Sequence, residues 1–316
     1  MISSRWSRLT GILLVALGAG CTGVASDTEA GPGVRPDGPR PPATAAYASE
    51  VGARRLSQAE LDHALRDLLQ DDTGPATRIL IEDNFAPYDN DYTLQRASEA
   101  LVTGIEQLSM DVADRLTADA ARRSVLLPCE PTGADDDACF RSFIEDFVPR
   151  ALRRPVSDEE IAAYMTLQSF ATEDNPNVDN DFYTAVGLVI RAVIQDPEFL
   201  YRIEVGAPTE NRGVYALDGY EIATRMAFLI LGSTPDDALL ADAAAGTLET
   251  PDGRRSVAQR LFADERAKEQ LHRFHAMWLG YRTIPHGVDL VSGFNQETTS
   301  LLDRVIFDDR RSYLDV

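Results

Sequence analysis

The sequence predicts an all-α protein with two to three packed helical subdomains that follow a disordered N-terminal tether. Helix-capping signals recur along the chain, and apolar residues at helical spacing follow each of them. No run of residues alternates between apolar and polar in the way that a half-buried strand does. With 316 residues, 44% of them hydrophobic, the chain can bury a large core.

The first residues of the chain indicate export. Arg5 and Arg8 flank the start of an apolar run, LTGILLVALGA, which is shorter than the about 20 residues that a membrane-spanning helix needs. Such a run fits the apolar core of a secretion signal, and here it leads to small residues and a cysteine, LGAGC. We therefore predict a lipoprotein signal peptide over 1–20 and lipidation of Cys21. An ordinary signal peptide that is cut nearby is the alternative.

The stretch that follows Cys21 predicts a flexible tether. Residues 21–49 are rich in Pro, Gly and Ala and have no apolar periodicity, so they cannot bury enough surface to offset the chain entropy. A lipid on Cys21 would anchor the chain to a membrane of the cell envelope. Thr22 directly after the cysteine favours the outer membrane over the inner one.

The charge of the chain excludes several kinds of partner. A formal net charge of −21 argues against nucleic acid and against anionic lipid surfaces. It is compatible with divalent cations, with a basic partner, or with a role in solubility alone. Lys268 is the single lysine, and no GxxxxGK[ST] phosphate-binding motif is present.

Two cysteines enclose an acidic stretch, CEPTGADDDAC, over 129–139. Without a CxxC pair or a histidine nearby, Cys129 and Cys139 lack the companions of a zinc site, and the chain has no CxxCH haem attachment motif. In an oxidising compartment the pair predicts a disulfide, with free thiols and a metal site as the alternatives. Closing a loop of about ten residues contributes on the order of 2–3 kcal/mol to stability.

Three segments begin with the same helix-start signal. LSQAEL (56–61), VSDEEI (156–161) and LDGYEI (217–222) predict capping boxes at Ser57, Ser157 and Asp218. The apolar faces expected after them are formed by Leu61, Leu65, Leu68 and Leu69, by Ile161, Tyr164 and Leu167, and by Ile222, Met226, Phe228 and Leu229.

Further helices are predicted over 94–116, 138–151 and 181–195. Pro235 and Pro251, each preceded by threonine, are expected at the first position of a helix, and Gly246 is expected to end the first of these two helices. The last apolar stripe consists of Leu271, Phe274, His275, Trp278 and Leu279.

Several long motifs resemble a known family. They are RRLSQAELDHALRDLL (54–69) with FAPYDNDYT (85–93), ALRRPVSDEE (151–160) with QDPEFLYRIE (195–204), and LDGYEIATRMAFLILGSTPDDALLADAAAGTL (217–248) with FHAMWLGYR (274–282). In this order they resemble domains of unknown function 1587, 1595 and 1592 of secreted bacterial proteins, the cytochrome-associated surface proteins of the planctomycete type. The resemblance implies helical modules over 50–125, 126–206 and 214–316. It also implies that the chain is truncated within or just after the third module. No catalytic residue comes with the resemblance.

Two acidic loops contain oxygen ligands of the kind that a calcium site needs. In the first, residues 82–93, Asp83, Asp89 and Asp91 are the candidate ligands, because Ca²⁺ takes carboxylate oxygens. In the second, residues 173–181, the calcium-loop template fails, since Asn180 stands where the template has glycine. Solvated turns are the alternative interpretation of both loops.

His272 and His275 are three residues apart and share a helical face, a spacing that a metal can use. His275 belongs to the apolar stripe, so core packing is the favoured interpretation. No HExxH motif and no GxSxG nucleophile elbow is present.

The candidate functional residues are Glu198, Tyr201 and Arg202 in the run PEFLYR. Glu198 and Arg202 are four residues apart, a spacing at which the two side chains could pair on a helix, either in a site or as a structural ion pair. The sequence therefore predicts an envelope lipoprotein that acts as a helical binding or scaffolding component of an extracytoplasmic system, with protein partners. The alternative is a fragment of an extracytoplasmic hydrolase or redox enzyme that acts on a polymeric substrate; whether the chain is an enzyme stays open.

Overall fold

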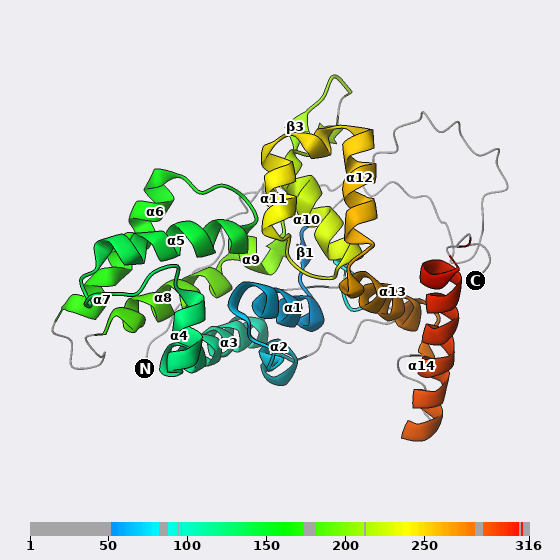
Figure 1. Ribbon diagram of the computed structural model, residues 1–316, viewed down its shortest axis with the longest axis horizontal. Helices are drawn as coiled ribbons and strands as arrows, with labels where there is room; N and C mark the ends of the chain where they lie inside the picture. The colour runs from blue at the N-terminus through cyan, green and yellow to red at the C-terminus, as the bar shows by residue number, and fades with distance from the viewer. Residues whose placement is uncertain are drawn as a thin grey trace, which may run out of the picture. The chain divides into compact units, whose positions relative to one another are not determined.

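The computed structural model describes residues 52–81, 88–93, 95, 97–173, 181–211, 213–281, 287–309 and 311, all within one unit spanning 48–316. Helices dominate this part of the chain, as Figure 1 shows, and the all-α prediction is confirmed. In the described residues, no helix has both the length and the apolar character to span a bilayer. The predicted signal peptide, Cys21 and the tether lie outside the described residues.

The elements follow one another in three groups. The first group contains α1 (Gln58–Leu69), α2 (Pro75–Ile79), α3 (Glu99–Ala118) and α4 (Ala120–Leu126). The second contains α5 (Asp137–Leu152), α6 (Asp158–Met165), the 3₁₀ turn η1 (Thr166–Gln168), α7 (Ser169–Thr172), α8 (Phe182–Gln195) and α9 (Pro197–Leu200). The third contains α10 (Gly219–Ile230), α11 (Asp237–Ala244), η2 (Thr247–Glu249), α12 (Pro251–Leu261), α13 (Glu265–Trp278), α14 (Val288–Leu302) and the π-helical segment η4 (Asp303–Asp308).

All three predicted capping boxes are present. Ser57, Ser157 and Asp218 each accept a hydrogen bond from the backbone N–H three residues later, and the glutamate there accepts one from the backbone N–H of the cap. These reciprocal bonds satisfy N–H groups that a helix start otherwise leaves unpaired. The starts of α1, α6 and α10 are therefore determined locally by the sequence.

Two predicted helix starts differ from the structure. The helix expected from residue 94 begins at Glu99, because Ser98 accepts a hydrogen bond from Leu101 N and caps α3. The helix expected from Pro235 begins two residues later, because the carboxylate of Asp236 accepts from Leu239 N at 2.7 Å. In both cases a side-chain cap determines where the helix begins.

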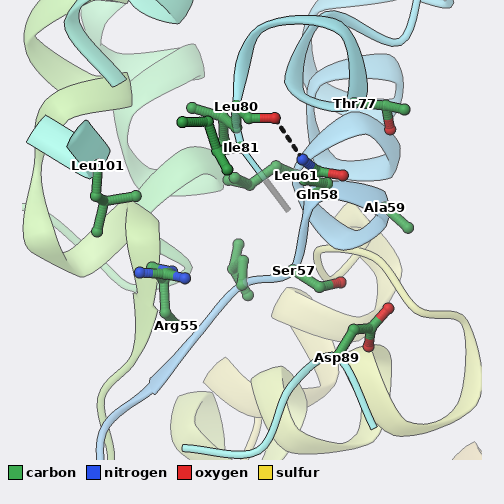
Figure 2. Close-up of a pocket in the computed structure, with 11 residues that line it drawn as sticks. Arg55, Ser57, Gln58, Ala59, Leu61, Thr77, Leu80, Ile81, Asp89 and Leu101 are labelled. Carbon is green, nitrogen blue, oxygen red and sulfur yellow. Dashed lines mark hydrogen bonds between the residues drawn. The ribbon is translucent and has the colours of Figure 1, made fainter. Parts of the chain in front are cut away.

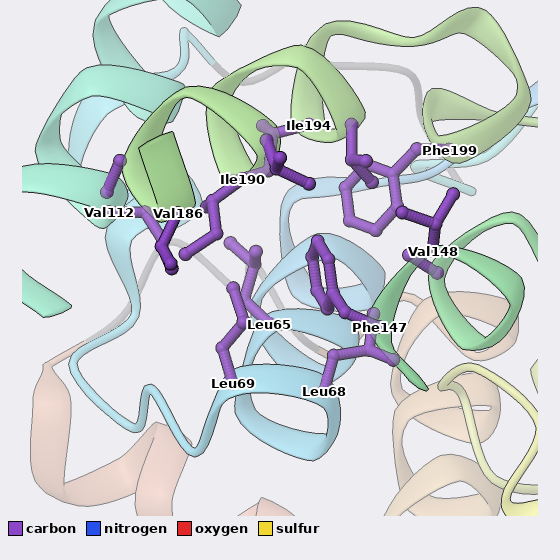
Figure 3. Packing of buried hydrophobic residues seen from close by; sticks show 14 of the residues in the cluster. Leu65, Leu68, Leu69, Val112, Phe147, Val148, Val186, Ile190, Ile194 and Phe199 are labelled. Carbon is purple, nitrogen blue, oxygen red and sulfur yellow. The ribbon is translucent and has the colours of Figure 1, made fainter. Parts of the chain in front are cut away.

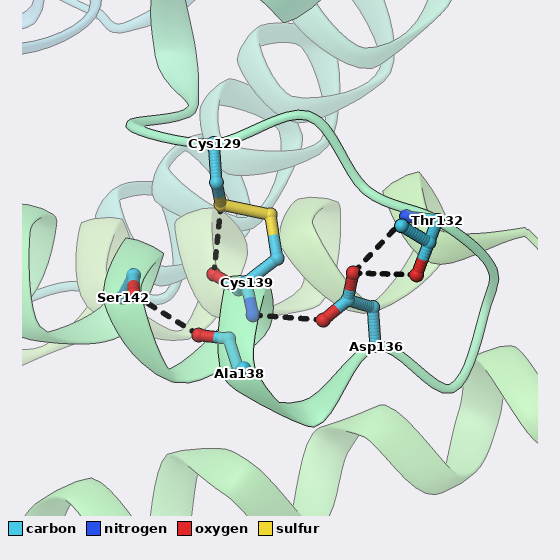
Figure 4. Close-up of a disulfide and its surroundings, with 6 residues drawn as sticks. All are labelled: Cys129, Thr132, Asp136, Ala138, Cys139 and Ser142. Atoms are coloured by element: carbon cyan, nitrogen blue, oxygen red, sulfur yellow. Dashed lines mark hydrogen bonds between the residues drawn. A yellow bond between two sulfur atoms is a disulfide. The ribbon is translucent and has the colours of Figure 1, made fainter.

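The predicted disulfide is confirmed. Cys129 and Cys139 are bonded, with their Cα atoms 5.7 Å apart (Figure 4). Asp136 organises the loop, since one carboxylate oxygen accepts from Cys139 N at 3.0 Å and the other accepts from Thr132 N at 3.0 Å. The disulfide bond therefore connects the start of α5 to the segment that precedes this helix.

The first two groups share one hydrophobic core. Side chains from α1, α3, α5, α8 and α9 meet in it (Figure 3), and those that the figure labels include Leu65, Val112, Phe147, Ile190 and Phe199. The predicted face of α1 is correct, because Leu61, Leu65, Leu68 and Leu69 are all buried.

The third group has a core of its own, formed by residues such as Ala223, Ala227, Leu239, Leu248 and Leu261 of α10, α11, η2 and α12. The predicted face of α10 is partly wrong, because Leu229 is exposed. Phe228 is the exception on α10, since it belongs to the core of the first two groups.

Strands are limited to two short pairs in the described chain. β1 (Arg54–Arg55) pairs antiparallel with β2 (Tyr201–Arg202), and β3 (Ala207–Pro208) pairs antiparallel with β4 (Tyr215–Ala216). The first pair connects the segment before α1 to the segment after α9, and Leu56 N donates to Leu200 O at 2.8 Å beside it. The start of the first group thus lies against the end of the second.

Candidate functional site

The run PEFLYR forms a short helix and a strand. α9 ends at Leu200, and the chain then enters β2 with Tyr201 and Arg202. Asp196 caps α9 by accepting from Glu198 N at 2.7 Å. Arg202 has left the helix, and the two side chains have other partners: Glu198 pairs with Arg154 and Arg202 with Glu60.

Arg153 holds this run in place. It is the C-cap of α5, with φ 62°, and its side chain is buried. The guanidinium donates to the carbonyls of Ala151 at 3.2 Å, Phe199 at 3.3 Å and Tyr201 at 3.0 Å, and also to that of Glu198. Burial lowers the pKa of Arg153 to about 10, so the group stays protonated near neutral pH. Arg153 therefore satisfies carbonyl groups that the short helix α9 leaves without intrahelical partners.

Arg154 binds two carboxylates at once. It donates to Glu198 at 2.6 and 3.1 Å and to Glu160 at 2.8 and 3.2 Å. Glu160 also accepts from Ser157 N at 2.8 Å in its capping box. The Arg154 hydrogen bonds, followed by the bond from Ser157, lower the pKa of Glu160 to about 2. Glu160 is therefore ionised near neutral pH and cannot serve there as a proton donor.

This low pKa predicts an acid-sensitive contribution to stability. The folded-state pKa of Glu160 lies below its ordinary value of 4.5, so its contribution is present above pH 4.5 and is lost as the pH falls toward 2. Because Arg154, Glu160 and Glu198 are all partly exposed, we expect the contribution to be no more than about 1 kcal/mol. Urea unfolding between pH 7 and pH 2.5 should show a shallower loss of stability for Glu160→Gln than for the wild type. Glu145→Gln, on exposed Glu145, is the control; an unchanged slope for Glu160→Gln would contradict the assignment.

Arg202 forms a buried ion pair with Glu60. The Nη2 of Arg202 lies 3.9 Å from the Oε1 of Glu60, and the two side chains are 9% and 1% exposed. Glu60 uses its other oxygen to accept from Ser57 N at 2.9 Å. Neither the Oε1 of Glu60 nor the Nε and Nη2 of Arg202 has a hydrogen-bond partner among the described residues. The aromatic ring of Phe228 lies beside this pair, with the Arg202 guanidinium 5.4 Å from the ring centroid.

Phe228 brings the third group to the first two. Its side chain is 1% exposed, and the guanidinium carbons of Arg153 and Arg202 lie 5.7 and 5.4 Å from the ring centroid. Both distances are within the range of a cation–π interaction. We call the set Glu60, Arg153, Arg202 and Phe228 the junction, because it contains residues from all three groups.

Polar contacts extend the junction along α1. His63 Nδ1 lies 3.1 Å from Gly232 O, just after α10. The carboxylate of Asp67 accepts from Ser233 Oγ at 2.6 Å and from Arg266 Nη1 at 2.7 Å. One side of α1 therefore contacts the third group through hydrogen bonds and an ion pair.

Gly232 is required by the close approach at this contact. Its φ is +63°, and a Cβ atom there would lie 2.5 Å from Oε1 of Gln270. Gln270 is itself held by a hydrogen bond from its Nε2 to Phe228 O at 3.2 Å. A larger residue would therefore strain the backbone and displace a side chain at the edge of the junction.

Two cavities lie near the candidate residues Glu198, Tyr201 and Arg202, and neither cavity is lined by all three. One of about 290 Å³ is lined by Glu198 with Arg153 and Arg154. The other, of about 140 Å³, is lined by Asp89 and by Gln58, whose Nε2 donates to a carbonyl at 2.6 Å (Figure 2). Arg202 lines neither cavity. Both are smaller than the roughly 300–1,000 Å³ of most small-molecule sites.

The structure places two of the three calcium candidates. Asp89 is paired with Arg273, which also donates to Ser57 Oγ at 2.9 Å. Asp91 accepts from Thr93 N at 3.0 Å and from Thr93 Oγ1 at 2.6 Å. Asp83 and the acidic loop 174–180 lie outside the described residues. Within the described ranges, no group of three His, Cys, Asp or Glu side chains is arranged to hold a metal ion.

The two histidines of α13 have separate partners. His275 is buried, and its Nδ1 lies 2.8 Å from Leu271 O in the preceding turn. His272 Nε2 lies 2.7 Å from Asp303 Oδ1. The favoured interpretation of His275 as a packed residue fits its burial, and the structure uses His272 to connect α13 with η4.

Part of the predicted stripe on α13 faces outward. Phe274, Trp278 and Leu279 are exposed, and only His275 of the stripe is buried. The ring of Phe274 stacks against Trp278 at a centroid distance of 5.9 Å and against Tyr88 at 6.3 Å. We call Tyr88, Phe274, Trp278 and Leu279 the aromatic face.

Sequence reasoning missed most of the junction. Of the four junction residues it singled out Arg202 as a functional candidate, and it overlooked Arg153, the second role of Glu60 and the special position of Phe228. The pair of arginines in LRRP was the available signal, because an arginine at a helix C-terminus can donate to carbonyls that the helix leaves free. Glu60 was assigned to a capping box alone, and its second role depends on a residue more than 140 positions away.

Three family matches cover most of the chain. Residues 54–118 match a protein of unknown function (DUF1587), residues 139–204 match DUF1595, and residues 217–315 match DUF1592. No curated protein and no solved structure matches the chain.

Proposed function

This chain belongs to the multi-module family in which DUF1587, DUF1595 and DUF1592 follow one another, and on that premise we propose that it is a lipid-anchored helical scaffold of the bacterial cell envelope. Cys21 carries the lipid, residues 21–49 form the tether, and the helical body holds a partner protein of an extracytoplasmic system at the outer membrane. The strong negative charge makes nucleic acid an unsuitable partner.

The observation that carries this proposal is the junction. Phe228 of the third group lies in the core of the first two, and two arginine side chains flank its ring. A buried aromatic anchor of this kind couples consecutive modules, so that a surface on the third group keeps a fixed relation to the first. A scaffold needs this property, since it must present its binding surface in a constant orientation.

The aromatic face supplies a surface for a partner. Trp278 is 52% exposed, and the side chains of Phe274 and Leu279 beside it are also exposed. Aromatic residues are enriched in the centres of protein–protein interfaces, and contiguous exposed apolar side chains mark interaction sites. The partner that fits this face is a protein with a complementary apolar surface.

The anchor is tested by phase separation of the full chain after expression in a bacterial host. In Triton X-114, we expect the wild type in the detergent phase and Cys21→Ala in the aqueous phase, because the substitution removes the lipid attachment point. A wild-type protein in the aqueous phase would overturn the lipoprotein assignment.

The scaffold role is tested by native electrophoresis of the protein solubilised from envelopes of its native host. The double variant Phe274→Ser and Trp278→Ser should migrate as a smaller complex than the wild type, because these exposed rings form the centre of the partner surface. Tyr215→Ser, at an exposed position of β4, is the control and should leave the complex intact. A complex of unchanged size in the double variant would contradict the role of the aromatic face.

A further inference from the structure

A polar cavity is lined by the long helices α3 and α8. Its volume is about 470 Å³, and both helices line it, α3 with Asp114 and Thr117 and α8 with Tyr183, Gly187 and Arg191. This volume falls within the roughly 300–1,000 Å³ of small-molecule sites. The cavity is separate from the junction and from the aromatic face.

One pair of opposite charges at this cavity, Arg123 and Asp181, interacts with other groups of the protein. Arg123 donates through Nε to Thr117 O, and its guanidinium carbon lies 4.0 Å from the centroid of the Tyr183 ring. Its Nη2 lies 3.9 Å from Asp181 Oδ2. Asp181 also caps α8 by accepting from Tyr183 N at 3.2 Å. Arg123 and Asp181 therefore compensate each other and form a fixed wall.

A second pair of opposite charges has no side-chain partner within the described part of the chain. The side chains of Arg191 and Asp114 make no hydrogen bond and no ion pair with any residue that the structure describes, and they do not pair with each other. Arg191 is partly buried and Asp114 is exposed. They come from the two facing helices, so a guanidinium and a carboxylate border the same cavity at separate positions.

We propose that this cavity binds a small zwitterion, an amino acid or a short peptide, with its carboxylate on Arg191 and its ammonium group on Asp114. A guanidinium binds a carboxylate through two parallel N–H···O bonds, and a carboxylate accepts charge-assisted bonds from an ammonium group. A ligand with both charges satisfies both side chains, whereas a ligand with one charge leaves the other unpaired. Gly187 has no side chain, and a Cβ atom there would be in van der Waals contact with Thr117 Cγ2 at 3.6 Å, so the glycine leaves that volume unfilled beside the cavity.

The structure of the cavity also determines which variants are informative. Arg191 and Asp114 have no side-chain partner among the described residues, so Arg191→Gln and Asp114→Asn should leave the fold unchanged. Arg123 would be a poor choice, because it holds Thr117 and Tyr183. Arg141→Gln is the matched control, since Arg141 lies on α5 and pairs with Glu145 at 3.5 Å.

Isothermal titration calorimetry with the dipeptide alanylalanine tests the proposal on the folded full chain, with unfolding temperatures recorded for each variant. We expect saturable binding to the wild type and to Arg141→Gln, and binding at least about tenfold weaker to Arg191→Gln and to Asp114→Asn. Acetate and methylamine, which each carry one of the two charges, should bind at least about tenfold more weakly than the dipeptide. No saturable binding of the dipeptide to the wild type at about 10 mM would overturn the proposal, as would equal binding to all the variants. The result does not depend on lipidation or on the aromatic face.

Discussion

Replacing Phe228 with alanine should lower the free energy of unfolding by about 3–5 kcal/mol, the usual range for removing a buried phenylalanine. The ring is fully enclosed in the core that the first two groups share, although it belongs to α10. Its removal creates a cavity between groups and takes away the ring that flanks Arg153 and Arg202. The measurement is urea unfolding at pH 7 followed by circular dichroism.

Phe262→Ala is the matched control for this substitution. Phe262 follows α12 in the same group of helices, and its side chain is about half exposed. We expect the control to cost less than about 1 kcal/mol, because exposed sites away from special features tolerate substitution. Equal losses for the two variants would contradict a special role of Phe228 at the junction.

Replacing Arg153 with alanine should lower the free energy of unfolding by about 3 kcal/mol. The carbonyls of Ala151, Glu198, Phe199 and Tyr201 would each lose a donor, and an unsatisfied buried carbonyl costs about 1–3 kcal/mol. Part of this loss is offset, because the alanine variant no longer pays the desolvation free energy of a buried guanidinium charge. Arg153→Lys should recover little, because an ammonium group cannot reproduce the planar fork of donors.

A glycine variant separates the contribution of the Arg153 side chain from the strain of its backbone. The φ of 62° at this position is strained for any residue with a Cβ atom, so Arg153→Gly relieves about 1 kcal/mol that Arg153→Ala retains. We expect the glycine variant to be more stable than the alanine variant and less stable than the wild type. A glycine variant more stable than the wild type would show that the guanidinium contributes less than the strain that glycine relieves, and would contradict the loss of about 3 kcal/mol expected for Arg153→Ala.

The elements that local chemistry determines could be predicted from the sequence. The three capping boxes, the buried face of α1 and the disulfide depend on residues that are close together in the chain. Hydrogen bonds between neighbours and the period of apolar residues are visible in one sequence without knowledge of the fold.

The junction could not be predicted in the same way. The spacing of Glu198 and Arg202 allows a pair along a helix, but α9 ends at Leu200 and Arg202, in β2, pairs with Glu60 instead. That partner depends on the pairing of β1 with β2, which joins residues about 150 positions apart. The expected burial of the α13 stripe was partly wrong for a related reason. Periodicity marks an apolar face of a helix, but it does not show whether another element covers that face.

Native-state hydrogen exchange in increasing urea tests the central claim, that the junction couples the third group to the first two, most directly. Peptides from α8 report the core of the first two groups, and peptides from α12 report the core of the third. Coupled modules unfold together. In the wild type we therefore predict the same opening free energy for the slowest-exchanging amides of α8 and α12. In Phe228→Ala we predict a lower opening free energy for α12 than for α8. Unequal values already in the wild type, unchanged by Phe228→Ala, would contradict the claim.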